Sequence, residues 1–287
     1  MSKIDLHMHS TASDGSLSPK ELIDLAIRKK IPAISITDHD TTAGNNEAIE
    51  YAKTKNIEFV TGIEITITPP EDCKELHLVG LFINSNNNKI KNIQTKNRKR
   101  VEEVIKKIIR KLNQLGYEIT FEELLNETDE KQLGRPFIAR ILMRKYPKEF
   151  PNRKDVFNKL LGKSGKAFVR PKGTPLKEAI KMIHNAGGIA IIAHPWYLGD
   201  QMEKIVETFS NLGGDGIEIS YTPKESIPKN MKKRLIKISE EKNLITSGGT
   251  DFHEMKKNEK EIGENGLSFR EFRALKEYHK KKFGNSY

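Results

Sequence analysis

The chain has 287 residues, enough to bury a sizeable core as one large α/β domain or as a domain that carries a smaller insertion. Apolar residues make up 36% and charged residues 31%, as in a soluble globular protein, and no apolar run approaches the roughly 18 residues of a membrane span. The single cysteine, Cys73, excludes an intrachain disulfide and favours the reducing cytoplasm. The formal charge of +11 favours anionic partners such as phosphates or nucleic acid.

Short apolar runs alternate with helical patterns in the first 83 residues and again after about residue 176. The runs are rich in Ile, Val and Leu and predict strands over residues 4–8, 33–37, 57–67, 76–83, 188–195, 216–221 and 244–253. Helices are predicted over residues 19–30, 44–55 and 175–186 and from about residue 268, the first with Ser18 at its N-cap and Pro19 at its first position. This alternation is typical of a largely parallel sheet.

The middle of the chain has a different pattern. Residues 90–166 are mostly helical in pattern and heavily basic, as in KNRKRVEEVIKKIIRKLNQLGYE. We therefore predict a helical insertion domain over residues 90–166, preceded by a linker at SNNNKIKN, and a barrel or sheet domain formed by residues 1–89 and 167–287. The basic run could bind nucleic acid, but its acidic interruptions and Ile/Val spacing favour an amphipathic helix with a solvated face.

Two histidines stand one residue apart in the first predicted strand, within KIDLHMHSTASDG. Because residues i and i+2 of a strand point to the same face, His7 and His9 present two imidazoles side by side, as a bidentate metal site would. An isolated pair of this kind is more often two hydrogen-bonded core histidines. The rest of the chain decides between these interpretations.

Further polar residues stand within or directly after the other predicted strands. They are His39, Glu64, His77, His194, Asp251 and His253. Six of the eight histidines thus fall in or at the end of an apolar strand, where α/β barrels keep their active sites, and we expect His184 and His279, on predicted helices, to be ordinary. Buried carboxylates are costly unless cations pair with them, and nitrogen and oxygen ligands without cysteine suit Zn²⁺, Mn²⁺ or Fe²⁺.

Six motifs in order resemble the PHP family, named for polymerase and histidinol phosphatase. They are DLHMHSTASDG, ITDHDT, GIEIT, LHLVGL, GGIAIIAHP and GGTDFH, and they extend over nearly the whole chain apart from the helical insertion. The segments GRPFIARIL and VRPKGTPLKEAIKMIHNAGG also resemble the stand-alone bacterial and archaeal phosphoesterase branch. The resemblance implies a distorted (β/α)7 TIM-like barrel with a trinuclear metal site at its C-terminal rim.

The resemblance also implies nine metal ligands in three groups. The first metal would be held by His7, His9, Glu64 and Asp251. Glu64 would bridge to a second metal, which His77 and His194 complete. The third would be held by Asp14, His39 and His253. All nine positions carry the expected residue type, whereas a catalytically dead member would be expected to have lost some.

Candidate substrate-binding residues are basic. We expect Arg135 to contact phosphate, because a guanidinium can meet phosphate oxygens in bidentate fashion, although an arginine that caps a helix near Pro136 is an equal alternative. Arg170 and Lys172 are weaker candidates of the same kind. Phe137 stands where similar family members often have a histidine, which puts a substrate contact at this position in doubt.

The expected reaction is hydrolysis of a phosphate ester by two or three Mn²⁺, Zn²⁺ or Fe²⁺ ions, with His253 or His194 as a possible acid or base. The expected substrate is a small phosphorylated molecule, either a nucleoside 3′,5′-bisphosphate or a short oligoribonucleotide, with no membrane or obligate protein partner. One alternative is a histidinol-phosphate phosphatase, which shares the metal motifs. The other is a non-catalytic metal-bound module that binds nucleic acid, although the complete ligand set counts against it.

Overall fold

The computed structural model describes residues 3–70, 73, 75–127, 133–170, 172–220, 230–254, 262–264 and 266–284. The chain divides into two compact units, one formed by Met1–Gln94 and Thr174–Tyr287 and the other by Thr95–Gly173. We call the first the sheet unit and the second the helical unit. The helical unit begins and ends a few residues later than the insertion predicted over residues 90–166.

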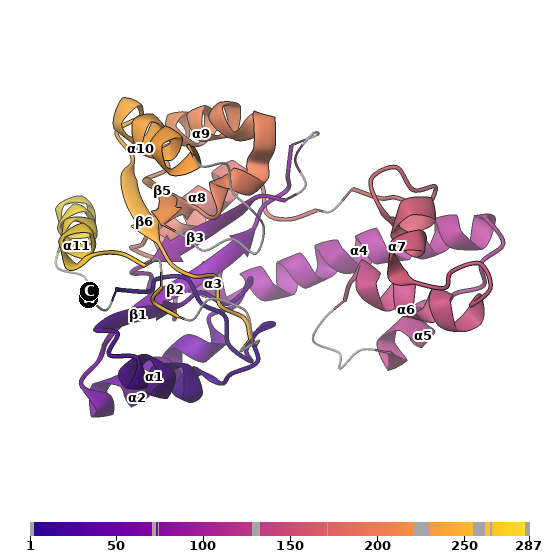
Figure 1. Ribbon diagram of the computed structural model, residues 1–287, viewed down its shortest axis with the longest axis horizontal. Helices are drawn as coiled ribbons and strands as arrows, with labels where there is room; N and C mark the ends of the chain where they lie inside the picture. The colour runs from indigo at the N-terminus through magenta and orange to yellow at the C-terminus, as the bar shows by residue number, and fades with distance from the viewer. Residues whose placement is uncertain are drawn as a thin grey trace. The chain divides into compact units, whose positions relative to one another are not determined.

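The sheet unit is built on a curled six-stranded sheet whose strands lie in chain order (Figure 1). The strands are β1 (Ala33–Ile36), β2 (Glu58–Thr66), β3 (His77–Leu81), β4 (Ile189–Ile192), β5 (Gly216–Ser220) and β6 (Ile245–Gly248). The pairs β1/β2, β4/β5 and β5/β6 are parallel, but β3 is antiparallel to both of its neighbours. The fold is therefore mixed α/β, and the predicted largely parallel sheet contains one reversed strand, β3.

The reversal of β3 has a simple cause and a consequence for the site. A parallel neighbour needs a crossover of about a dozen residues or more, usually a helix, whereas only the ten residues 67–76 separate β2 from β3. The first residue of β3, His77, consequently pairs with Thr66 at the end of β2. His77 therefore lies at the edge of the sheet where the parallel strands end.

Two of the predicted strands differ from the structure by more than a few residues at their ends. Residues 4–8 form isolated bridges instead of a strand, with Asp5 paired to Ile34 and Met8 paired to Phe252. The strand predicted over residues 244–253 ends at Gly248, and Asp251 adopts a left-handed backbone with φ of 52°, which a strand cannot contain.

Helices surround this sheet. They are α1 (Pro19–Arg28), α2 (Ala43–Lys55), α3 (Asn88–Lys91), α8 (Leu176–Asn185), the 3-10 helix η2 (Pro195–Gln201), α9 (Met202–Asn211), α10 (Met231–Glu241) and α11 (Phe269–Phe283). In Figure 1, α1 and α2 lie side by side and pack on β1 and β2, while α8 packs on β4 and α10 on β5 and β6. The start of α1 is confirmed: Ser18 and Glu21 form a capping box in which each side chain accepts the other residue's amide.

The segment predicted as a linker, residues 85–92, contains helix α3 instead. The Asn87 side chain accepts a hydrogen bond from the Lys89 amide and caps the helix, while Ile90 is fully buried in the core of the sheet unit. The segment is polar apart from Ile90, so the burial of this one side chain anchors it.

The helical unit has its own apolar core. Its elements are α4 (Ile93–Gln114, which begins two residues before the unit), α5 (Phe121–Asn126), α6 (Arg135–Lys145), α7 (Arg153–Val156) and the π-helix η1 (Phe157–Leu161). Ile108, Leu112, Ile138 and Leu161 are fully buried in this core. No helix among the described residues of either unit combines the length and apolarity needed to cross a membrane.

One buried carboxylate, that of Asp215, joins three elements of the sheet unit. It accepts hydrogen bonds from His184 Nε2 at 2.7 Å, from the Ala190 amide at 2.8 Å and from the Tyr278 hydroxyl at 2.8 Å, and it pairs with Lys282. Burial alone would raise the pKa of Asp215, but the hydrogen bonds from His184 and Lys282 outweigh burial and hold it below its ordinary value. The carboxylate therefore ties α8 and α11 to the sheet.

We expect Asp215→Asn to lower the free energy of unfolding by about 2 kcal/mol at pH 7, because the amide cannot serve all four donors. The pKa of Asp215 is lower in the folded than in the unfolded protein, so its ionised carboxylate stabilises the fold at pH values above the unfolded pKa of about 3.9. This stabilisation is lost as the pH falls through the pKa of the folded protein. Urea denaturation should therefore show a difference in the free energy of unfolding between wild type and variant that is smaller at pH 3 than at pH 7. The exposed Asp200→Asn is the control, and a gap of equal size at both pH values would contradict this account.

Candidate metal centre

The structure brings all nine predicted ligand residues together at one edge of the sheet unit. His7 and His9 come from the N-terminal segment, Asp14 from the loop after it, and His39 from the end of β1. Glu64 lies in β2, His77 begins β3 and His194 follows β4. Asp251 and His253 lie in the segment after β6. The edge is the one at which β1, β2, β4 and β6 end.

The first group is the most buried. His7, His9 and Glu64 have no exposed side-chain surface, and Asp251 is 14% exposed. The Nε2 atoms of His7 and His9 are 3.3 Å apart, and both lie 3.0–3.4 Å from Glu64 Oε2 and Asp251 Oδ1. Two nitrogens and two carboxylate oxygens therefore lie close enough to one another to bind a single cation.

A second group surrounds the carboxylate of Glu64. Its Oε1 atom lies 3.1 Å from His77 Nδ1 and 2.9 Å from His194 Nε2, and its Oε2 atom lies 3.1 Å from His39 Nδ1. Glu64 thus contacts ring nitrogens of both groups with its two oxygens. His39, which the resemblance assigned only to the third group, lies against this one as well.

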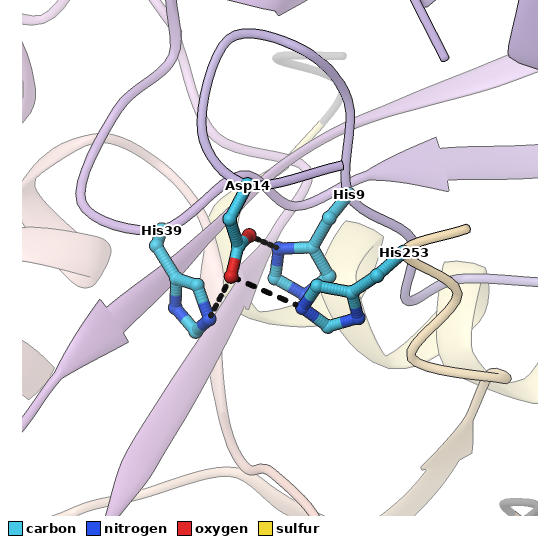
Figure 2. Close-up of side chains that lie close together, drawn as sticks. All are labelled: His9, Asp14, His39 and His253. Atoms are coloured by element: carbon cyan, nitrogen blue, oxygen red, sulfur yellow. Dashed lines mark ion pairs between the residues drawn. The ribbon is translucent and has the colours of Figure 1, made fainter. Parts of the chain in front are cut away.

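The third group is shown in Figure 2, where Asp14 points its carboxylate at three imidazoles. Asp14 Oδ1 lies 3.6 Å from His9 Nδ1, while Oδ2 lies 3.9 Å from His39 Nε2 and 3.4 Å from His253 Nε2. Asp14 is 40% exposed, His39 28% and His253 18%. We call the nine side chains together the cluster, and this third group forms its solvent-facing side.

The loop that presents Asp14 is held by a buried neighbour of His39. Asp38 accepts hydrogen bonds of 2.7 Å from the amide and hydroxyl of Ser10 and from the hydroxyl of Ser13. The turn also requires Gly15, because a Cβ there would lie 2.1 Å from the His9 carbonyl oxygen. Sequence reasoning found Asp14 but did not identify Asp38 as its support.

The side chains fit divalent cations. Among the buried side-chain atoms that make no hydrogen bond within the described residues, three lie in the cluster, namely His9 Nδ1, His39 Nδ1 and Glu64 Oε2; the last two are 3.1 Å apart but do not form a hydrogen bond. Each such buried polar atom costs about 1–3 kcal/mol if nothing pairs with it, and a cation beside it removes this cost. Nitrogen and oxygen donors without sulfur are those that Zn²⁺, Mn²⁺ and Fe²⁺ accept.

Electrostatics in the cluster indicate the same need for positive charge. Burial alone would raise the pKa of Glu64, but His39, His7 and His77 hold it well below its usual range. Burial opposes protonation of His9, yet Asp251 and Glu64 raise its pKa to about 10. The His39 imidazole is different, since burial lowers its pKa to about 3 and keeps it neutral. The carboxylates thus remain ionised and require cationic partners.

Two of the residues in the cluster have strained backbones. His194 has φ of 32° and Asp251 has φ of 52°, and both lie in the left-handed region that favours glycine. Such conformations cost on the order of 1–3 kcal/mol and persist where the surrounding structure enforces them, often at functional sites. Here they direct the His194 and Asp251 side chains to the cluster.

Sequence analysis missed one buried carboxylate behind the cluster, that of Glu218 in β5. Its Oε1 atom lies 2.9 Å from His7 Nδ1, and its Oε2 atom accepts the His194 amide at 2.7 Å. A carboxylate in this position fixes the tautomer and orientation of a metal-binding histidine. The available signal was an acidic residue inside an apolar strand, GIEISY, the same signal that identified Glu64.

The predicted substrate-binding residues all belong to the helical unit. Arg135 begins α6, donates to the Leu161 carbonyl at 3.2 Å and lies over the Phe168 ring, so it has a structural role inside that unit. Burial lowers the pKa of its guanidinium. Arg170 and Lys172 are exposed. Phosphate contacts by these three residues stay a prediction.

Neither of the helical histidines belongs to the cluster. His184 pairs with Asp215, and His279 is buried against Phe82 and donates to the Gly187 carbonyl at 2.7 Å. Both have structural partners, as expected of ordinary histidines.

Comparisons with known proteins identify the family of this chain. The family model described as PHP domain matches residues 5–188. A 5′-3′ exoribonuclease of Haemophilus influenzae is 34% identical over 254 residues, which are 88% of this chain and 90% of the relative. A 3′,5′-nucleoside bisphosphate phosphatase of Chromobacterium violaceum is 29% identical over 267 residues, covering 92% and 91% of the two chains. The crystal structure of a candidate metal-dependent phosphoesterase of Bifidobacterium adolescentis aligns with a TM-score of 0.72 and 26% identity over 95% of this chain and 94% of that one.

The chain therefore belongs to the PHP domain family, and it is a hydrolase of the metal-dependent phosphoesterase class. The family resemblance predicted from the six motifs is confirmed. Within the family, the chain is similar to proteins named as an exoribonuclease and as a nucleoside bisphosphate phosphatase.

Proposed function

We propose that the chain hydrolyses phosphate esters of nucleotides, either a nucleoside 3′,5′-bisphosphate or the 5′ end of a short oligoribonucleotide, at a trinuclear metal site. The observation that carries this proposal is the convergence of nine imidazole and carboxylate side chains, three of which have buried atoms without a hydrogen-bond partner among the described residues. The substrate class rests on the names of the two similar relatives and on the positive charge of the chain.

Each cluster group has a role in this proposal. His7, His9, Glu64 and Asp251 would hold one cation, Glu64 with His77 and His194 the second, and Asp14 with His39 and His253 the third. Bound divalent cations would neutralise the phosphoryl oxygens and lower the pKa of water toward neutrality. The substrate would enter from the side of Asp14 and His253, because the first group is buried.

Hydrogen bonds fix the tautomer of two of the imidazoles, those of His253 and His7. His253 Nδ1 lies 2.8 Å from the Asp251 carbonyl oxygen, which can only accept, so Nδ1 carries the proton and Nε2 presents its lone pair toward Asp14. Glu218 orients His7 in the same way. His253 cannot hold a cation and exchange a proton through the same Nε2 atom, so it would act as the acid or base only in the absence of the third cation; it is then better placed than His194, because its side chain is more exposed.

We also propose that the sheet closes as the distorted (β/α)7 barrel that the resemblance implies. The segment before Ser10 is hydrogen-bonded on one side to β1, where the Ser35 amide donates to the Asp5 carbonyl at 2.9 Å. On the other side the Leu6 amide donates to the carbonyl of Gly248 in β6 at 3.3 Å. The same segment thus joins both ends of the six-stranded sheet.

The experiment that tests the function is a phosphate-release screen with Mn²⁺, Zn²⁺ and Fe²⁺ supplied in turn. We expect turnover of adenosine 3′,5′-bisphosphate or of 5′-phosphorylated oligoribonucleotides that exceeds turnover of histidinol phosphate by at least about 100-fold, and a chelator should abolish it. Preference for histidinol phosphate would establish the first alternative. Tight RNA binding with no hydrolysis under any metal would establish the non-catalytic one.

A further inference from the structure

The helical unit carries the entire net charge of the chain. It contains 21 of the 50 lysines and arginines but only 10 of the 39 aspartates and glutamates, a formal charge of +11. The sheet unit contains the other 29 basic and 29 acidic residues and is neutral overall. An excess confined to one unit is not a general property of the surface of this protein, so it requires a local explanation.

Part of this excess lies on one face of α4. Ile105, Ile108 and Leu112 bury the opposite face in the core of the helical unit. The exposed positions 96, 99, 103, 107 and 110 are spaced by three or four residues and therefore lie along one stripe. They are Lys96, Lys99, Glu103, Lys107 and Arg110, over about 21 Å of helix at 1.5 Å per residue. We call the four cations of this stripe the α4 basic stripe.

Three of the four cations of the stripe, Lys99, Lys107 and Arg110, have no acidic partner among the described residues. Three acidic residues of the unit pair elsewhere, Glu102 with Lys106, Glu123 with Lys145 and Glu127 with Arg144. Glu103 lies within the stripe, which therefore has four cations and one anion, a net charge of +3. In the part of the chain that the structure describes, Lys99 and Lys107 form no ion pair, and Arg110 donates only to the Lys106 carbonyl. A stripe of this kind attracts a polyanion more strongly than an equal number of paired cations would.

We propose that the α4 basic stripe binds single-stranded RNA, an inference that rests on the proposed function of the sheet unit. The exposed stripe has no apolar residue to insert into a bilayer, since the apolar face of α4 is buried, so a membrane surface is disfavoured. Lysines and an arginine at regular spacing match the phosphates of a nucleic-acid backbone, which they contact without reading sequence.

RNA bound by the stripe would favour hydrolysis through tethering. Both units belong to one chain, so an oligonucleotide held by the helical unit has its 5′ end at a raised effective concentration near the metal centre. A nucleoside bisphosphate is too small to gain from this effect. The stripe therefore lowers KM for oligoribonucleotides and leaves KM for bisphosphates unchanged.

The test is a triple charge reversal, Lys99→Glu, Lys107→Glu and Arg110→Glu, in the full-length metal-loaded protein. The matched control is Lys177→Glu, Lys181→Glu and Lys204→Glu, which changes the charge equally at exposed helical positions of the sheet unit. Binding is measured by fluorescence anisotropy with a labelled 12-nucleotide single-stranded RNA whose phosphorothioate linkages resist cleavage. Each protein is titrated at several salt concentrations.

We expect the stripe variant to bind this RNA at least ten-fold more weakly at 100 mM salt, and the control to remain within two-fold of wild type. The slope of log affinity against log salt should fall in magnitude by about 2, because each neutralised phosphate of a single strand contributes about 0.7. Wild-type affinity and slope in the stripe variant would overturn the proposal, as would tighter binding of wild type to phosphatidylserine vesicles than to RNA.

Hydrolysis of adenosine 3′,5′-bisphosphate separates this inference from the proposed function. We expect the stripe variant to retain kcat/KM for the bisphosphate within two-fold while KM for the oligoribonucleotide rises at least ten-fold. An equal loss on both substrates would overturn the separate role of the stripe. A wild-type protein that binds RNA through the stripe but hydrolyses neither substrate would refute the proposed function and leave the stripe intact.

Discussion

Asp251→Asn is expected to lower kcat/KM by at least about 1,000-fold and to reduce the bound metal by about one ion per chain. The Asp251 Oδ1 atom lies 3.4 and 3.0 Å from His7 and His9 Nε2, and a neutral asparagine amide in its place would bind a cation much more weakly than the carboxylate. Asparagine keeps the shape of the side chain and tolerates the left-handed backbone at this position, so the fold should persist.

Metal content by mass spectrometry, circular dichroism and phosphate release together check this expectation. The exposed Asp200→Asn variant provides the matched control, with unchanged metal content and turnover. Full activity in Asp251→Asn would refute the assignment of the first group. Loss of activity with loss of folded structure would require the Asp251→Ser variant before any conclusion on the metal.

The second large effect is expected from Glu218→Gln, which acts through His7 without a contact to substrate. Glu218 accepts two donors, the His7 Nδ1–H and the His194 amide, with its two oxygens. Glutamine has one oxygen, so one of these donors must face an NH2 group. We expect metal affinity to fall by about 10–100-fold, the usual effect of losing such a hydrogen bond behind a ligand.

Titration against a competing chelator measures this change in metal affinity. If Glu218 only stabilised the fold, its replacement would lower the free energy of unfolding without a specific loss of metal affinity. A positioning role also predicts that excess metal restores kcat to within a few-fold of wild type, and that Glu218→Asp retains more affinity than Glu218→Gln. The matched control is Glu203→Gln on the exposed surface of α9. Wild-type metal affinity in Glu218→Gln would show that Glu218 does not orient His7.

Much of the candidate site could be predicted from the chain alone, because its chemistry is local. His39, Glu64 and His194 each interrupt or end an apolar run, and a polar group in that context is costly unless it has a purpose. The capping box at Ser18 and the strands β1 and β2 follow from equally local preferences. Arg135 could not be decided in this way, because the segment GRPFIARIL is consistent both with a phosphate contact and with an arginine that caps a helix.

The tertiary structure decided which atoms face one another. Only the reversed direction of β3 explains why His77, at the start of its strand, joins residues at the ends of others. Glu218 became a site residue only when β5 placed it behind His7, 211 positions away in the chain. The sequence determined which side chains could bind metal, because residue type and local burial suffice for that. Strand direction and register determined the site, because they depend on hydrogen bonds between segments far apart in the chain.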